Sequence, residues 1–521
     1  MNMKTRPRTA IALLLALGLT VSAGLAAQSR ETAYPEYKEL VAAFELKDAG
    51  LRLKELERIG AAYPDSPYKE AIEGGILQAR TELAKTLEAV LAVQREFMAN
   101  GEGPARIQKP VIAAAQLLAH PRLGTFNAPA VLEAVLKYKG MAREAAEDVS
   151  SYEGIPQNQR DPFKSQVLNA FELMAAKAYL NAGIAPKALE TLESYRRSGG
   201  ATGGDYYHTL AVVKEKMSRI DEAYDAFLTA AVEEFEDSAD RARALYVKIH
   251  GRPDGFEAAL EAKSKALPFH AAAFEAPADW KGKAVLAELF TGSECPPCVG
   301  VDIAFDGLAE TIPAKYLAVL VYHLPIPRPD PMMNPATEAR QGVYGVDRTP
   351  TVIIDGINRP FGGGARGAAE GRYAQYRAVI EPSLTAVPVV SPKVRASLAG
   401  DTVNVSYDFD RTVPGAEYHL VLVQNEQEHK GGNGIAYHRM VVRDLLMVDP
   451  AGPRAAVFDL AASEKATDAY LTEFEKAYPR TQGFKWDVRR NVLPRTGLKV
   501  VFFIQEKDTK KVLNAVVADV K

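Results

Sequence analysis

The chain has 521 residues, of which 47% are hydrophobic and 25% are charged. This length suggests roughly three domains, and the composition excludes a collagen-like or wholly disordered protein. The 63 Lys and Arg residues nearly balance the 66 Asp and Glu residues, which gives a formal net charge of −3. Because no global basic field exists to hold a polyanion, we expect no nucleic-acid partner.

The N-terminal residues differ in composition from the rest of the chain. Basic residues precede an almost unbroken apolar stretch from Ile11 to Leu25, and small residues follow it. This order is typical of a cleaved export signal, which we assign to residues 1–27. An uncleaved anchor is the alternative, although about fifteen apolar residues are fewer than the ~20 that cross a bilayer. We therefore expect an exported protein, periplasmic, cell-envelope or secreted, whose mature chain has no membrane span.

Residues 31–267 are rich in Ala, Leu, Glu and Lys with a helical period, which predicts an all-α region. Traces of a 34-residue helical-hairpin repeat occur in it, with small residues at the positions where two helices would approach. We expect a TPR-like array, with an irregular helical bundle as the alternative; either could present a protein-binding face. The residues that carry the repeat are Ala176, Tyr179, Gly183, Ala188 and Leu192, then Tyr207, Leu210, Ala211, Ala223, Phe227 and Ala230.

Strand and helix patterns alternate after a Pro- and Gly-containing linker at 268–283. Beyond about residue 387 the apolar period changes to two, which predicts a β-sandwich interrupted by one helix. The predicted central strands are 284–290, 316–322 and 351–354, and the central helices are 298–312 and 334–344. The predicted C-terminal strands include 403–407, 418–423, 500–504 and 512–520, and the helix is 464–478.

Cys295 and Cys298 are the only cysteines, and they enclose two prolines at the first strand-to-helix junction. Disulfides form and persist in an exported protein, but a bridge over two residues removes little unfolded-chain entropy. Neither His270 nor His323 has metal-ligand spacing to the pair. The pair therefore predicts redox chemistry without a metal or a cofactor. A structural or vestigial pair is the alternative.

Phe290, the Cys-Pro-Pro-Cys motif and Thr349-Pro350 resemble the thioredoxin superfamily. Residues 288–295, Tyr322-His323, Asp330-Pro331-Met332 and the C-terminal β extension are similar, more narrowly, to exported TlpA-like or outer-membrane-associated thioredoxin-fold proteins. The resemblance covers residues 284–379 and, more loosely, the β extension, whereas the helical half lies outside it. Together with the helical and strand patterns it predicts a multidomain α + α/β + β chain. Its expected parts are a helical TPR-like domain at 31–267, a thioredoxin-like domain at 283–385 and a β-sandwich domain at 387–521.

The resemblance, together with the position of the cysteines, implies a role for each residue of the motif. Cys295 precedes a helix, whose unpaired N–H groups favour an anion and lower the thiol pKa, so we expect it to be an accessible nucleophile. Cys298 lies one helical turn further on and is the expected resolving thiol. Pro350 is expected as a cis-proline beside the sulfurs, where the Thr349 backbone would pair with an extended substrate. A trans proline that opens a strand is the alternative.

Five further residues are candidate accessory groups: Glu288, Glu294, Pro296, Pro297 and His323. The two prolines stiffen the motif or merely punctuate the loop. Glu294 stands where the family usually has an aromatic residue, and the position of the buried acid that assists the second thiol in many thioredoxins is occupied by Leu289. His323 either reaches the site or is a structural histidine.

These features predict a protein thiol–disulfide oxidoreductase that acts on protein substrates and is reset by a redox partner protein. The alternative is a non-catalytic cell-envelope scaffold that uses the same fold and the helical repeats for docking.

Overall fold

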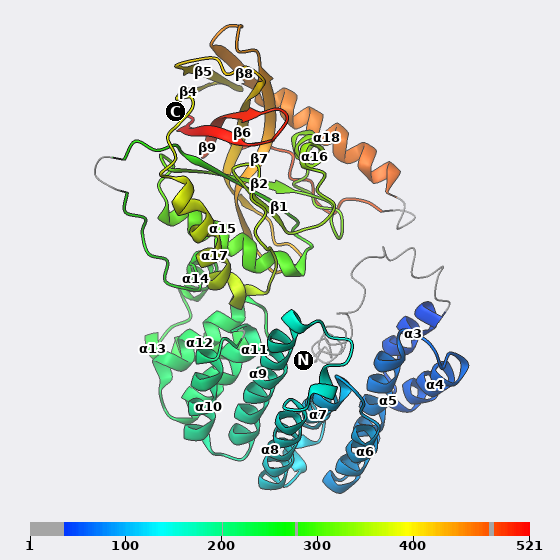
Figure 1. Ribbon diagram of the computed structural model, residues 1–521. Coiled ribbons are helices and arrows are strands. Elements are labelled where there is room, and N and C mark those ends of the chain that lie inside the picture. The colour runs from blue at the N-terminus through cyan, green and yellow to red at the C-terminus, as the bar shows by residue number, and fades with distance from the viewer. Residues whose placement is uncertain (1–35, 201, 277–279, 479–483) are drawn as a thin grey trace. The chain divides into compact units, whose positions relative to one another are not determined.

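The computed structural model describes residues 36–200, 202–276, 280–478 and 484–521, so the predicted export signal lies outside the described residues. The chain forms two compact units (Figure 1). The first contains the described residues up to 227 except 202–204, and the second contains 202–204 and the remainder of the chain. The division therefore falls earlier than the boundary expected near residue 268.

The N-terminal region is helical, as its period predicts, and short turns separate the helices. Side-chain caps begin several of them: Asp48 accepts a hydrogen bond from the Leu51 N–H at 2.8 Å, and Asn127 does the same for Ala130 at 3.0 Å. The helices are α3 (Glu36–Glu45), α4 (Ala49–Ala62), α5 (Lys69–Leu83), α6 (Leu87–Ala99), α7 (Ala105–Leu118), α8 (Ala128–Ala145), α9 (Gln157–Asn181), α10 (Ala185–Arg197), α11 (Gly204–Lys216), α12 (Ile220–Val232), α13 (Ser238–His250) and α14 (Phe256–Lys265).

Small residues allow close packing of α9 and α10. Ala176, Ala188 and Leu192 are fully buried and share one core cluster with Tyr195. An alanine at such a position lets two helix backbones approach, and the larger side chains fill the space beside it.

The central region alternates strands and helices, and each predicted element is confirmed to within one residue at either end. β1 is buried along its whole length, which is typical of a strand inside a covered sheet. It pairs in parallel with β2 and antiparallel with β3. The elements are β1 (Val285–Thr291), α15 (Val299–Thr311), β2 (Leu317–His323), α16 (Pro335–Tyr344), β3 (Thr351–Ile354) and α17 (Ala369–Ser383).

The C-terminal region is mainly β, but its strands do not form a separate sandwich. Two sheets do pack over a shared apolar core that includes Val405, Leu420 and Phe502. The larger sheet, however, continues into the central region in the order β10-β9-β6-β7-β2-β1-β3, while the smaller has the order β4-β5-β8. The elements are β4 (Pro392–Ala399), β5 (Thr402–Phe409), β6 (Ala416–Glu428), β7 (Tyr437–Val448), β8 (Ala455–Asp459), α18 (Leu460–Ala477), β9 (Leu498–Glu506) and β10 (Val512–Asp519).

The parallel pairing of β2 with β7, at Val321 and Val441, joins the two parts of the large sheet. α15 contributes Phe305 and α17 contributes Tyr376 to the core under this sheet. The two rings pack edge to face, with their centroids 5.7 Å apart. The expected separate domains at 283–385 and 387–521 are therefore one continuous body with a common sheet. Among the described residues no helix combines the length and apolar character needed to cross a bilayer.

Candidate functional site

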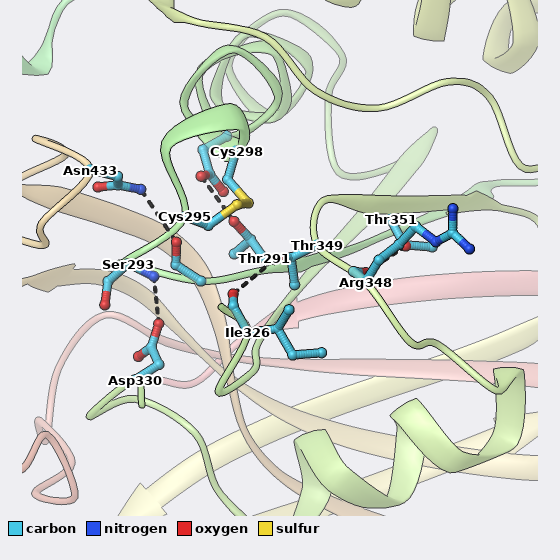
Figure 2. The surroundings of a disulfide bond; sticks show 12 residues. Thr291, Ser293, Cys295, Cys298, Ile326, Asp330, Arg348, Thr349, Thr351 and Asn433 are labelled. Carbon is cyan, nitrogen blue, oxygen red and sulfur yellow. Dashed lines mark hydrogen bonds between the residues drawn. A yellow bond between two sulfur atoms is a disulfide. The ribbon is translucent and has the colours of Figure 1, made fainter. Parts of the chain in front are cut away.

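The two cysteines lie where β1 gives way to α15. The Cys295 N–H donates to the carbonyl oxygen of Gly292 at 3.0 Å, and a 3₁₀ turn, Pro296–Cys298, leads into the helix. Cys295 and Cys298 are joined by a disulfide bond, with their Cα atoms 5.3 Å apart (Figure 2). A proline at the start of such a turn costs little because its missing N–H has no partner there.

Both cysteines are buried, which corrects the expectation of an accessible nucleophile. Cys295 is 1% exposed and Cys298 is 0% exposed, whereas Pro296 and Pro297 between them are exposed. The motif therefore turns its prolines to solvent and its sulfurs inward. Loops around Asp330, Gly364 and Gly432 form hydrogen bonds with the backbone or side chains on either side of the motif.

Pro350 opens β3, and the Thr349–Pro350 peptide bond is cis. Gly363 lies between this proline and the cysteine motif, since a Cβ added at Gly363 would be within 4.0 Å of atoms of both Pro297 and Pro350. The Thr349 hydroxyl donates to the Ile326 carbonyl oxygen at 2.8 Å. Figure 2 shows both residues beside the disulfide. The structure thus brings the four residues predicted for exchange and substrate contact into one region.

Glu288 belongs to a different network and is not an accessory of the cysteines. Its carboxylate accepts hydrogen bonds from Arg340 at 2.7 and 2.9 Å, from Tyr344 at 2.6 Å and from Tyr322 at 3.1 Å. Glu288 and Arg340 are almost fully buried. Although burial opposes the charge, the adjacent Glu288 carboxylate raises the pKa of Arg340 above its usual value. A carboxylate with every partner in place is a structural ion pair that joins β1 to α16.

His323 is also structural in its contacts, but these contacts hold the segment before Cys295. Its Nδ1 lies 2.9 Å from Asp330 Oδ2, and the same oxygen accepts the Ser293 N–H at 2.6 Å. Asp330 Oδ1 accepts the Met332 N–H at 2.8 Å. Burial would raise the pKa of Asp330, yet His323 and the two N–H donors lower it below the usual range. The ionised Asp330 therefore ties Ser293 to the end of β2 (Figure 2).

Glu294 contacts the hairpin loop between β6 and β7 rather than the sulfurs. Its Oε1 accepts the Gly432 N–H at 2.8 Å. The next residue of the loop, Asn433, donates its N–H to the Ser293 carbonyl oxygen at 3.0 Å and its side-chain amide to that of Gly292 at 3.3 Å. Hydrogen bonds from the C-terminal region thus hold the turn that leads into Cys295.

Asp302 is a further acidic residue of this region, and the sequence reasoning missed it. It lies four residues after Cys298, whose helical backbone conformation continues into α15, so both side chains project from the same helix face. Its Oδ2 accepts a hydrogen bond from Thr291 at 2.9 Å. Burial raises the pKa of Asp302 well above its usual value, and the Thr291 hydroxyl offsets only part of this. An acid one turn beyond a cysteine in an apolar helix is the signal that could have revealed it.

Asp306 continues the same face one turn further on. Burial raises its pKa to about 7, while the guanidinium of Arg439 opposes the shift. Two weakly acidic carboxyl groups therefore follow Cys298 along α15.

Comparisons with protein-family models, curated proteins and solved structures found no match to this chain.

Proposed function

We propose that this chain exchanges thiols and disulfides with protein substrates through Cys295 and Cys298. The observation that carries the proposal is the disulfide between the two cysteines that lead into α15, with Pro350 across Gly363 from the motif. The dipole of a helix stabilises a thiolate near its N-terminus, which lowers the thiol pKa and makes the first thiol more reactive and a better leaving group. The resemblance to exported thioredoxin-fold proteins supports the same chemistry.

The exchange balances over two steps. In the reduced protein, the Cys295 thiolate attacks one sulfur of a substrate disulfide, which forms a mixed disulfide and releases the other substrate sulfur as a thiolate that takes a proton. Cys298 then loses its proton and attacks Cys295, which restores the Cys295–Cys298 bond and releases the second substrate thiolate. The substrate gains two electrons and the protein loses two. A partner protein dithiol resets the pair, and the reverse sequence oxidises a substrate dithiol with a partner disulfide.

Asp302 is the proton acceptor that this scheme assigns to Cys298. A carboxyl group whose pKa is raised toward that of a thiol exchanges a proton with it more readily than an ordinary Asp. The i, i+4 spacing along one helix face supports the pairing. The family position for such an acid holds Leu289 here, so the group would come from the helix instead of the strand.

Turnover of a protein disulfide tests the proposal. The mature chain is mixed with a disulfide-bonded protein substrate and a reductant, and the rate of thiol release is compared with that of Cys295→Ser. We expect the wild type to exceed the variant by at least about tenfold, because only Cys295 can form the first mixed disulfide. Equal rates would remove the proposal.

The burial of the cysteines favours one second candidate, a non-catalytic scaffold of the exported compartment. In such a scaffold the disulfide is permanent, and the TPR-like helices and the β region bind partner proteins. The two candidates differ in the reactivity of the reduced cysteines: a scaffold predicts no mixed disulfide with any substrate protein.

A further inference from the structure

We propose that the tip of the β6–β7 hairpin, residues 430–435, is a cover that must lift from the cysteine motif before another molecule can reach the disulfide. The inference concerns access to the bond and does not require that the protein be an oxidoreductase. It accounts for an unexpected property of the motif, which exposes its prolines but keeps both of its cysteines at 1% exposure or less.

The tip is held against the three residues that precede Cys295. Gly432 N–H donates to Glu294 at 2.8 Å, Asn433 N–H donates to Ser293 at 3.0 Å, and the Asn433 amide donates to Gly292 at 3.3 Å. Each residue of the 292–294 turn thus receives one hydrogen bond from the tip.

The closeness of this contact depends on glycine. A Cβ at Gly431 would overlap the Ser293 carbonyl oxygen, and one at Gly432 would overlap the Glu294 carboxylate. The backbone carbonyl of Ser293 cannot move aside, so a side chain at 431 would push the tip away from the turn, whereas the Glu294 carboxylate at 432 can rotate. The sequence Gly-Gly-Asn-Gly at 431–434 therefore favours the closed position, in which the tip lies against the 292–294 turn.

The tip is also held less firmly than the loop around Asp330. The loop around Asp330 is buried and tied by the carboxylate to Ser293 and Met332. The tip, in contrast, is partly exposed and contributes one buried apolar side chain, Ile435, which packs on Val299 and Ile303. Segments with few buried apolar contacts and exposed backbone hydrogen bonds open locally at low free-energy cost.

The rate at which the Cys295–Cys298 disulfide is reduced measures this opening. The oxidised mature chain is treated with excess dithiothreitol below its unfolding temperature, and free thiols are counted over time. The double variant Asn433→Ala with Glu294→Ala removes two of the three hydrogen bonds, and we expect reduction about tenfold faster than in the wild type. Gly434→Ala gives a second variant that removes no side-chain contact. Gly434 has φ +86°, so alanine strains the closed tip and should also accelerate reduction.

Thr509→Ala is the matched control, because Thr509 lies in the β9–β10 turn and bonds within that turn to Glu506 and Lys511. It should leave the rate unchanged. Rates within twofold of wild type in both tip variants would overturn the cover. So would a steep increase of the wild-type rate with urea, since reduction would then proceed through global unfolding instead of a local opening.

The outcome is distinct from that of the proposed function. Faster reduction in the tip variants, with no turnover of protein disulfides by any form of the chain, keeps the cover and removes the oxidoreductase. Turnover by the wild type with unchanged reduction rates keeps the oxidoreductase and removes the cover.

Discussion

The hydroxyl of Thr291 donates to Asp302 Oδ2 at 2.9 Å, which ties the last residue of β1 to the helix that follows Cys298. The bond fixes an acid of raised pKa on the helix face of the second cysteine. It has two consequences for the site: the acid cannot turn toward solvent without losing a partner, and it is held one helical turn from Cys298, the thiol that loses its proton in the proposed exchange.

Asp302→Asn should slow the resolution of mixed disulfides. Asparagine keeps the size of the side chain and can still accept from Thr291, but it cannot take a proton from Cys298. In a single-turnover experiment followed by acid quench, we expect the mixed disulfide to accumulate and its decay to slow by about tenfold or more at neutral pH. Asp306→Asn serves as the control because its carboxyl group lies a further turn away. Equal slowing by both variants would assign the effect to general loss of charge in α15.

Asp306 should make the stability of the protein fall as pH rises from about 4 to about 7. Its pKa is raised to about 7 in the folded chain, so the folded state holds a proton over this range that the unfolded state has lost. Asp306→Asn should flatten the decline and increase the free energy of unfolding at pH 7 by roughly 1–3 kcal/mol. Urea unfolding at several pH values measures this. Parallel pH profiles for the variant and the wild type would contradict the account.

Glu288→Gln should destabilise the chain without changing the chemistry of the cysteines. The substitution leaves the buried guanidinium of Arg340 without its charged partner, for which we expect a loss of about 3–5 kcal/mol in the free energy of unfolding. A double variant, Glu288→Gln with Arg340→Met, should recover part of the loss because no unpaired charge remains. Alkylation of the reduced cysteines across a pH series should give the same thiol pKa in Glu288→Gln and wild type; a shifted pKa would return Glu288 to the redox site.

Asp330→Asn should loosen the turn before Cys295. The carboxylate accepts the Ser293 and Met332 N–H groups and contacts His323, and its replacement should cost about 2–4 kcal/mol at neutral pH. Since its pKa is lowered in the folded state, the stabilisation is present above the usual Asp pKa and is lost as the pH falls toward the folded value. The difference between variant and wild type should therefore shrink in acid. A difference that is constant with pH would mean that the charge contributes nothing.

Local patterns predicted the central elements well, because apolar runs and helical spacing report directly on buried strands and amphipathic helices. The cysteine pair and Thr349-Pro350 were singled out by their spacing and by the family resemblance. The continuity of the sheet was missed because the pairing of Val321 with Val441 joins segments far apart in sequence, and a period of two says which face is buried but not which strand lies alongside. The burial of Cys295 was missed as well, because the residues that surround it come from segments far apart in the sequence.

The role of an accessory residue could not be predicted from its position in the sequence alone. Glu288 was a candidate because it lies one residue from Leu289, the position of the buried acid in the family, yet its partner Arg340 comes from a different element. Asp302, by contrast, could have been found from helical geometry alone, since an acid four residues after Cys298 must share its face.

The central claim, that Cys295 attacks and Cys298 resolves, is tested most directly by capture of a substrate protein. Cys298→Ser and Cys295→Ser are each reduced, mixed with the same disulfide-bonded protein, quenched with acid and analysed by non-reducing electrophoresis and mass spectrometry. The account predicts a mixed disulfide on Cys295 in Cys298→Ser, at a level at least about tenfold above that on Cys298 in Cys295→Ser, because the proposed exchange makes Cys295 the attacking thiol and Cys298 the resolving one. Equal capture by the two variants, or capture by neither, would contradict it.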